Sequence, residues 1–499
     1  MLDASWLSYY ASRNADRVYG SFKKVLSFGD FHIGVSSSLP ISTANCDSCK
    51  CVVLGLCVDS RGEIERSQVA AYLLSGNLVE VQEKLNRLAG CFIAIIQTNV
   101  SSFVFTDACA MLPCFHATTG DFSSSDYLLA QCNGFVEGGS SAAMRRSSPI
   151  GKSLPYTYTS FEEVKALLPN HFLDLCTGSV TRYSPYPLSH YERLQEGELP
   201  EVVQQLVRLA DTTLAEYRKA LPGEPVAALT AGWDSRLNYA VLKRSHPNCS
   251  AFTFVHGGFT DATPDIEVPR SLCDRLNQKH VFLEDQHAPE SVVRQIDQVY
   301  GPYFDPSTTI DLAYTFRLAF PEGYLLSGHV IDGIGKNHVC NAIPLKMTSP
   351  TFFQEKTYCS APEGRKASSE WLEDVRQARD EIMSCDLFSI ENRIARWVTQ
   401  ATQLYSYLSL PVVDVFNCHE TIELMMRVPR SQRAKCAIHK EFFRQTAPNL
   451  LEDRFNGMGP IATKINTSWQ YSFLKARAKR IALRTCKKNG RNRHDEEFA

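Results

Sequence analysis

The stretch from Thr230 to Arg236 reads Thr-Ala-Gly-Trp-Asp-Ser-Arg and follows the apolar run Val-Ala-Ala-Leu at 226–229. Small residues after a strand allow backbone N–H groups to approach a ligand, and the first turn of a following helix adds donors without helical partners. Two hydroxyl groups, on Thr230 and Ser235, add further donors. The pattern indicates a phosphate-binding loop, although its spacing differs from the Walker motif.

Asp234 is the unexpected member of this loop, because a carboxylate repels phosphate. A Mg²⁺ ion held by carboxylate and phosphate oxygens would remove that conflict. The residues leave a second interpretation open, in which Thr230 or Asp234 caps a helix and Gly232 makes the turn.

A second segment of this kind, residues 324–333, reads Tyr-Leu-Leu-Ser-Gly-His-Val-Ile-Asp-Gly. The carboxyl ends of parallel strands meet in one crevice, so both segments are expected to face the same ligand. Asp332 would then be the second magnesium carboxylate, and Gly328 would let an adenosine pack against the backbone. Taken alone, a Ser-Gly turn followed by an aspartate is common in loops.

The first 190 residues predict an antiparallel β-rich domain, and a two-layer sandwich is one arrangement that fits this pattern. Apolar segments separated by turn residues predict strands, at 31–35, 51–58, 91–97, 101–107, 127–131 and 171–175. A helix is expected within 67–90, and the polar, Gly/Ser-rich stretch 137–152 is expected to be a surface loop.

The pattern changes near residue 195 to alternating helices and strands. Helices are expected at 198–221 and 265–277, and strands at 226–229, 250–257, 279–284 and 323–328. This alternation predicts a parallel sheet with crossover helices. The chain after residue 370 is expected to be mostly helical. The fold class predicted is therefore α/β plus a β-rich domain.

Composition is that of a globular protein. The chain has 499 residues, 44% hydrophobic and 21% charged, with a formal net charge of -2. Such an even balance gives no overall attraction to nucleic acid or acidic membranes. Neither a secretory signal nor an apolar run of the ~20 residues that span a bilayer is found, so the cytoplasm is the expected location.

The cysteines, 17 in number, are expected to be free thiols rather than a disulfide framework. Cys46, Cys49, Cys51 and Cys57 form a cluster that would suit a metal, but no second His/Cys pair follows at zinc-finger spacing.

The two loops together resemble those of the asparagine synthetase family of ATP pyrophosphatases. That family has Ser-Gly-Gly-x-Asp-Ser and Ser-Gly-Glu-Gly-Ala-Asp-Glu at these places. Stretches 88–116, 167–185 and 410–433, and Pro302 ahead of the second loop, also resemble family segments, in the same order along the chain. The resemblance therefore covers most of the sequence.

The resemblance implies a domain that binds ATP and Mg²⁺, adenylates a carboxylate, and lets a nitrogen nucleophile displace AMP. By position, Asp234 and Asp332 would hold Mg²⁺. The remaining ATP-binding positions that it implies are Leu229, Thr230, Ala231, Gly232, Ser235, Phe254, Ser327 and Gly328. The implied division is a glutaminase-like domain at 1–195, an ATP-binding domain at 196–475 and a basic tail at 476–499.

The sequence departs from the family at the residue that would hydrolyse glutamine. Position 2 is Leu rather than a nucleophilic Cys, so no glutaminase activity is expected. In this respect the chain resembles β-lactam synthetases and lasso peptide cyclases, which use an amine already present in the substrate.

Further departures lie in the ATP domain. His329 replaces a Glu or Tyr and could accept the proton of the attacking amine, or be a polar neighbour of the nucleotide. Asn456 stands where a C-terminal Lys is expected. Lys464 could supply that charge, and Gly333 replaces a second acid. Lys435 is a candidate phosphate contact or a solvated helix lysine.

The function expected is an ATP-dependent, AMP-forming amide ligase for a small-molecule or peptide carboxylate, with an amine or ammonia as the second substrate. The sequence leaves two alternatives: a nucleotide-binding pseudoenzyme and an RNA-modifying ATP pyrophosphatase. The basic tail is a solvated helix or a docking surface for an acidic partner, RNA or membrane. A homodimer is also left open.

Overall fold

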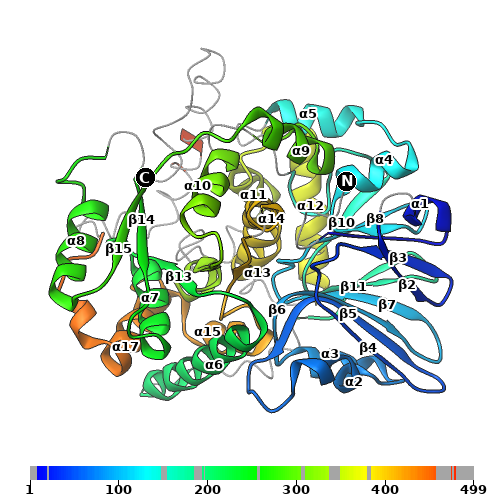
Figure 1. The fold of residues 1–499 in the computed structure, drawn as a ribbon. Helices are drawn as coiled ribbons and strands as arrows, with labels where there is room; N and C mark the ends of the chain where they lie inside the picture. The colour runs from blue at the N-terminus through cyan, green and yellow to red at the C-terminus, as the bar shows by residue number, and fades with distance from the viewer. Residues whose placement is uncertain are drawn as a thin grey trace.

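A computed structural model describes most of the chain. The described residues are 8–19, 22–147, 154–184, 194–195, 197–255, 259–304, 309–336, 349–378, 384–408, 410–456, 474 and 477–478. Within them the protein is a mixed α/β structure that contains two antiparallel sheets and one parallel sheet (Figure 1).

The N-terminal part is a sandwich of two six-stranded antiparallel sheets. The first has the order β10-β8-β9-β1-β3-β2 and consists of β1 (Tyr9–Ser12), β2 (Lys24–Phe28), β3 (Phe31–Val35), β8 (Cys114–Ala117), β9 (Phe122–Ser123) and β10 (Val164–Leu167). The second has the order β12-β11-β7-β6-β5-β4 and consists of β4 (Ile41–Asn45), β5 (Lys50–Asp59), β6 (Leu88–Gln97), β7 (Ser102–Thr106), β11 (His171–Asp174) and β12 (Val180–Arg182).

The side chains of β5 point alternately to the two faces of its sheet, and both faces are covered. Val52 and Leu54 belong to the core between the two sheets, whereas Cys51 and Val53 pack with helices on the outer face. Successive side chains of a strand point to opposite faces, so a run buried throughout needs cover on both. Helices α2 (Val69–Leu73) and α3 (Leu78–Leu85) cover this sheet, and α1 (Ala15–Tyr19) and α4 (Asp126–Asn133) cover the other.

The C-terminal part is built on a five-stranded parallel sheet of order β15-β14-β13-β16-β17. Its strands are β13 (Pro225–Ala228), β14 (Ala251–Val255), β15 (His280–Glu284), β16 (Tyr324–Leu326) and β17 (Val412–Val413). The chain starts at the centre, runs outward through β14 and β15, and returns to the other side of β13 at β16. This reversal of direction is the topological switch point of an open α/β sheet.

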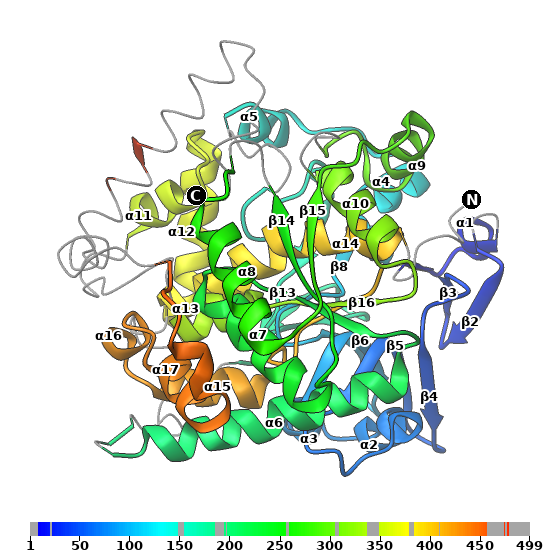
Figure 2. The same ribbon diagram turned by 60° about the vertical axis from the view of Figure 1, so that its left-hand side comes forward.

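Helices cover both faces of the parallel sheet (Figure 2). One face packs against α6 (Leu199–Ala220), α7 (Trp233–Ser245), α8 (Pro264–Leu276), α15 (His419–Arg427) and α17 (Ala437–Thr446). The other packs against α9 (Glu290–Tyr300), α10 (Asp311–Ala319) and α14 (Thr399–Tyr407).

The remaining helices include two of π type. These are η5 (Ile331–Lys336) and η9 (Ser389–Val398). The others are α5 (Gly139–Ser147), η2 (Arg66–Gln68), α11 (Pro350–Lys356), α12 (Pro362–Ala378), α13 (Ser384–Phe388), α16 (Arg430–Arg433) and η10 (Pro448–Leu451). Among the helices described, none has the length and apolar composition that crossing a bilayer requires.

Two local predictions were wrong. Residues 127–131 lie in helix α4 rather than a strand, because Ser125 accepts the N–H of Leu128 as an N-cap and Gly134, at φ 74°, forms a left-handed C-cap. Within 137–152, the expected loop, residues 139–147 form helix α5. The helix expected within 67–90 is two helices, α2 and α3, of which Asn77 caps the second.

Candidate functional site

The two predicted loops lie side by side at the carboxyl edge of the parallel sheet. Residues 229–235 follow β13 and residues 327–332 follow β16, and these strands pair directly, with Ala227 opposite Leu326. The switch point therefore places both loops at one crevice.

Hydrogen bonds within the first loop hold it in a compact turn. The hydroxyl groups of Thr230 and Ser235 lie 2.7 Å apart, and the N–H of Gly232 donates to Thr230 Oγ1 at 2.9 Å. Leu229 is buried and its N–H donates to the carbonyl of Phe252 on β14. The loop thus leads directly from the sheet into α7, as the sequence predicts.

One backbone N–H of this loop already donates a hydrogen bond to a carboxylate. Asp265, near the start of α8, accepts the N–H of Ala231 at 2.8 Å and also the side-chain amide of Asn456 at 2.8 Å. Asn456 in turn donates its own N–H to the carbonyl of Ala231 at 2.8 Å. The residue found in place of the expected lysine therefore lies against the loop, but it is neutral.

Arg236 fixes the C-terminal segment beside the loop. Its guanidinium is fully buried and donates to the carbonyls of Thr230, Leu450 and Asp453. Burial lowers the pKa of this side chain to about 10, which still leaves it charged at neutral pH. One cation therefore ties the first loop to the segment that carries Asn456.

Asp234 and Asp332 meet at a single ammonium group. Nζ of Lys336 lies 2.5 Å from Oδ2 of Asp234 and 3.1 Å from Oδ1 of Asp332. The other oxygens have partners too: His439 Nε2 lies 2.8 Å from Asp234 Oδ1, and Arg393 lies 2.8 Å from Asp332 Oδ2. All four carboxylate oxygens thus contact nitrogen atoms of the protein.

These contacts determine the charges in the cluster. Burial and the negative charge of Asp332 act to raise the pKa of Asp234, but Lys336 and the hydrogen bond from His439 outweigh them and hold that pKa below its usual range. For Lys336, burial acts to lower the pKa, and the two aspartates outweigh it and raise it. At neutral pH Asp234 and Lys336 are both charged. The cations of Lys336 and Arg393 together balance the two aspartates.

The residues present do not fit Mg²⁺ in this arrangement. Magnesium needs near-octahedral oxygen ligands at about 2.1 Å, and each carboxylate oxygen here already faces a cation or an N–H donor. Across the described ranges, no group of three or more His, Cys, Asp and Glu side chains is arranged to hold a metal. The prediction that the two aspartates converge agrees with this geometry, but an ammonium stands where the ion was expected.

Two π-helices bring the charged side chains together. Asp332 and Lys336 lie four positions apart on η5, and Arg393 lies on η9, which packs against it. A Cβ added at Gly333 would lie 3.1 Å from Cδ1 of Ile394 on η9. The second acid expected at position 333 is therefore replaced by the residue that lets the two helices approach.

The second loop is anchored to the sheet around it. The N–H of Ser327 donates to the carbonyl of Val413, and its hydroxyl lies 3.4 Å from Oδ2 of buried Asp414. A Cβ at Gly328 would lie 2.5 Å from the side-chain amide of Asn238 on α7. Close packing against Asn238 is one reason for glycine at this position, and its contact with an adenosine stays a prediction.

His329 is exposed to solvent but set among densely packed protein atoms. This environment and the guanidinium of Arg393 lower the pKa of its imidazole to about 4. The ring is therefore neutral at neutral pH and has a lone pair with which to accept a proton.

The remaining candidates are Lys435, Phe254 and Lys464. Lys435 is exposed, before α17. Phe254 is half-buried on β14, with its ring 6.0 Å from that of Phe316. Lys464 and most of the basic tail lie outside the described residues.

Sequence reasoning missed four residues of the site: Lys336, Arg393, His439 and Asp265. A signal existed only for Lys336, which follows Asp332 at the i,i+4 spacing of a helical ion pair. The other three come from elements far along the chain, and their types alone do not place them at this crevice.

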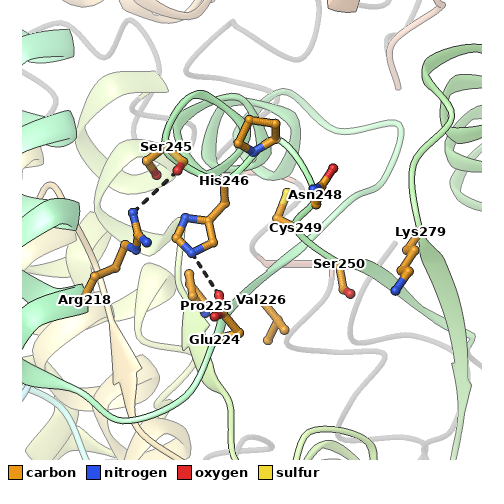
Figure 3. Close-up of a pocket in the computed structure, with 11 residues that line it drawn as sticks. Arg218, Glu224, Pro225, Val226, Ser245, His246, Asn248, Cys249, Ser250 and Lys279 are labelled. Atoms are coloured by element: carbon orange, nitrogen blue, oxygen red, sulfur yellow. Dashed lines mark hydrogen bonds and ion pairs between the residues drawn. The ribbon is translucent and has the colours of Figure 1, made fainter.

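A cavity of about 510 Å³ lies at the opposite edge of the sheet (Figure 3). Its lining includes Pro225 at the start of β13 and Lys279 just before β15. His246 pairs with Glu224 at 2.8 Å, and Arg218 donates to the carbonyl of Ser245. This cavity is therefore separate from the two loops.

No protein-family model matches the chain, and no curated protein sequence matches it. Among solved structures, glutamine phosphoribosylpyrophosphate amidotransferase from B. subtilis, complexed with ADP and GMP, aligns at 9% identity and a TM-score of 0.21. The alignment covers 54% of this chain and 56% of that one. So low a score carries no inference about fold or activity.

Proposed function

We propose that this chain is an ATP-dependent, AMP-forming ligase that adenylates a carboxylate and joins it through an amide bond to an amine or ammonia. The observation that carries the proposal is the meeting of Asp234 and Asp332 on Lys336 at the switch point of a parallel sheet. Ligands of open α/β sheets bind in that crevice.

In the first step, an oxygen of the substrate carboxylate attacks the α-phosphorus of ATP, and the bond to pyrophosphate breaks. Negative charge gathers on the leaving pyrophosphate, so preorganised cations lower the barrier. Lys336 and Arg393 would serve this purpose. The side chain of Lys336 is 23% exposed, which leaves its ammonium within reach of a ligand.

In the second step, the amine nitrogen attacks the acyl carbon and AMP leaves. The nitrogen must lose a proton as the amide forms. His329 is the candidate acceptor, because it is exposed at the second loop and its imidazole is neutral at neutral pH. Its pKa of about 4 makes it a weaker base than an ordinary histidine.

The proposal assigns no glutaminase to residues 1–195 and no metal ion to the two aspartates. The amine would come from the substrate or from free ammonia. The domain boundaries at 195 and 475 stay predictions.

The test is ATP–pyrophosphate exchange with a panel of carboxylic acids and peptides. Lys336→Met should reduce exchange on the order of 10²–10³-fold, because it removes one preorganised cation that would stabilise the leaving pyrophosphate. Lys84→Met is a matched control, because that lysine lies on α3 of the N-terminal sandwich, where it pairs with Glu80. Exchange that is equal in both variants would contradict the proposed site.

A nucleotide-binding pseudoenzyme is the second candidate. Two observations favour it: Asp265 already accepts the N–H of Ala231, and the carboxylates that should receive a metal are neutralised. Calorimetry that detects ATP binding, with no pyrophosphate released across the panel, would favour this candidate over the ligase.

A further inference from the structure

We infer that Lys336 is the built-in cation of this site, and that the phosphates of a nucleotide bind here without a divalent metal between Asp234 and Asp332. The inference rests on the proposed nucleotide site and adds to it the form of the ligand: a triphosphate free of metal, neutralised by the protein.

The carboxylate oxygens of Asp234 and Asp332 already have partners in the protein. A metal between the two aspartates would need at least one oxygen from each, and the inner oxygens, Asp234 Oδ2 and Asp332 Oδ1, both face the ammonium of Lys336. The outer oxygens face His439 and Arg393. A divalent ion could therefore enter only by displacing protein cations.

The charges of the two aspartates are balanced by protein cations. Among these four side chains, the two carboxylates are balanced by the ammonium of Lys336 and the guanidinium of Arg393, so the four carry no surplus negative charge to attract a divalent ion. Adding one would place it beside two cations in a half-buried setting, where repulsion is poorly screened. A triphosphate is anionic and would meet those cations favourably.

The packing of η5 and η9 fixes the position of the Lys336 ammonium. Lys336 lies four positions after Asp332 on η5, and Gly333 allows that helix to pack tightly against η9, which carries Arg393. His439 is fully buried and holds Asp234 from the other side. The ammonium is therefore positioned by the fold before any ligand arrives, as preorganised charge stabilisation requires.

The first experiment uses the full chain, with ATP as probe, and measures binding by calorimetry in EDTA and then in excess Mg²⁺. The wild type should bind in EDTA with a Kd within about tenfold of that in Mg²⁺. Lys336→Met should weaken binding in EDTA by more than about tenfold, and Lys336→Arg should retain it. Lys84→Met, on α3 of the N-terminal sandwich, is the matched control.

The second experiment needs no nucleotide. Electron paramagnetic resonance should detect no Mn²⁺ bound by the wild type, whereas Lys336→Met should gain one site that is lost in the double variant Lys336→Met/Asp332→Asn. Circular dichroism checks that each variant folds, and Lys336→Arg keeps the test decisive if the Met variant does not.

Two results would overturn the inference while leaving the proposed function intact: ATP binding that requires Mg²⁺ in the wild type, or one Mn²⁺ bound by the wild type and lost in Asp234→Asn. Failure of ATP to bind under either condition would overturn the proposed function. The Mn²⁺ measurement would then still decide whether Lys336 excludes a metal from the aspartates.

Discussion

Nε2 of His439 lies 2.8 Å from Oδ1 of Asp234, although the two residues are 205 positions apart in the chain. The contact requires a proton on Nε2, so the imidazole donates to the carboxylate. Nδ1 of the same ring is buried, with no hydrogen-bond partner among the described residues. The hydrogen bond to Asp234 is therefore the only one that the His439 ring makes among the described residues, and it orients the carboxylate of Asp234.

Replacing His439 should destabilise the protein. His439→Leu leaves one oxygen of Asp234 without its donor, and an unsatisfied buried polar group costs about 1–3 kcal/mol. The free energy of unfolding in urea should fall by that amount. His287→Leu is the control: its ring also contacts an aspartate, Asp311, but is 85% exposed, so a change of about 0–1 kcal/mol is expected. Equal losses in the two variants would show that burial of the contact does not matter.

Asp265 should oppose the binding of anionic ligands at the first loop. Asp265→Asn removes a negative charge 2.8 Å from the N–H of Ala231 but keeps an oxygen that can accept it. Charges about 4 Å apart in water interact by about 1 kcal/mol, so ATP affinity measured by calorimetry should rise several-fold. Asp261→Asn, an exposed aspartate paired with Arg270, is the control. Weaker ATP binding by Asp265→Asn would mean that the carboxylate supports the site.

Acid should weaken the contact between the N-terminal sandwich and α12. Burial acts to raise the pKa of Asp374, but the hydrogen bond from His171 and the charge of Arg182 outweigh it and lower that pKa to about 2. The unfolded value is about 3.9. A depressed folded pKa gives stability above about pH 4 that is lost as pH falls toward 2. Asp374 is 41% exposed, so solvent reduces the size of the effect.

The measurement is the free energy of unfolding of Asp374→Asn and the wild type, compared at about pH 5 and pH 3. The variant should be less stable at the higher pH, and the difference should shrink at the lower. A difference that stays constant would assign the stability to packing rather than to the charge. Asp30→Asn, at an exposed ion pair, should show little change at either pH.

Local pattern was sufficient for most elements. The apolar runs at 51–58 and 91–97, which lie in β5 and β6, and the amphipathic α6 follow from the local hydrophobic pattern, which depends only on neighbouring residues. The prediction of a strand at 127–131 was wrong because a short apolar run is compatible with either a strand or a helix. Ser125 and Gly134 cap the two ends of this segment and favour the helix.

The sequence by itself determined that two acidic loops follow two strands, and a parallel sheet then requires that those loops meet. Only the tertiary structure decided what lies between them. The cation, the guanidinium and the buried imidazole come from η5, η9 and α17, which packing brings to one crevice. Charge balance in that crevice depends on distances of a few ångströms between remote segments, and no periodicity along a chain encodes such distances.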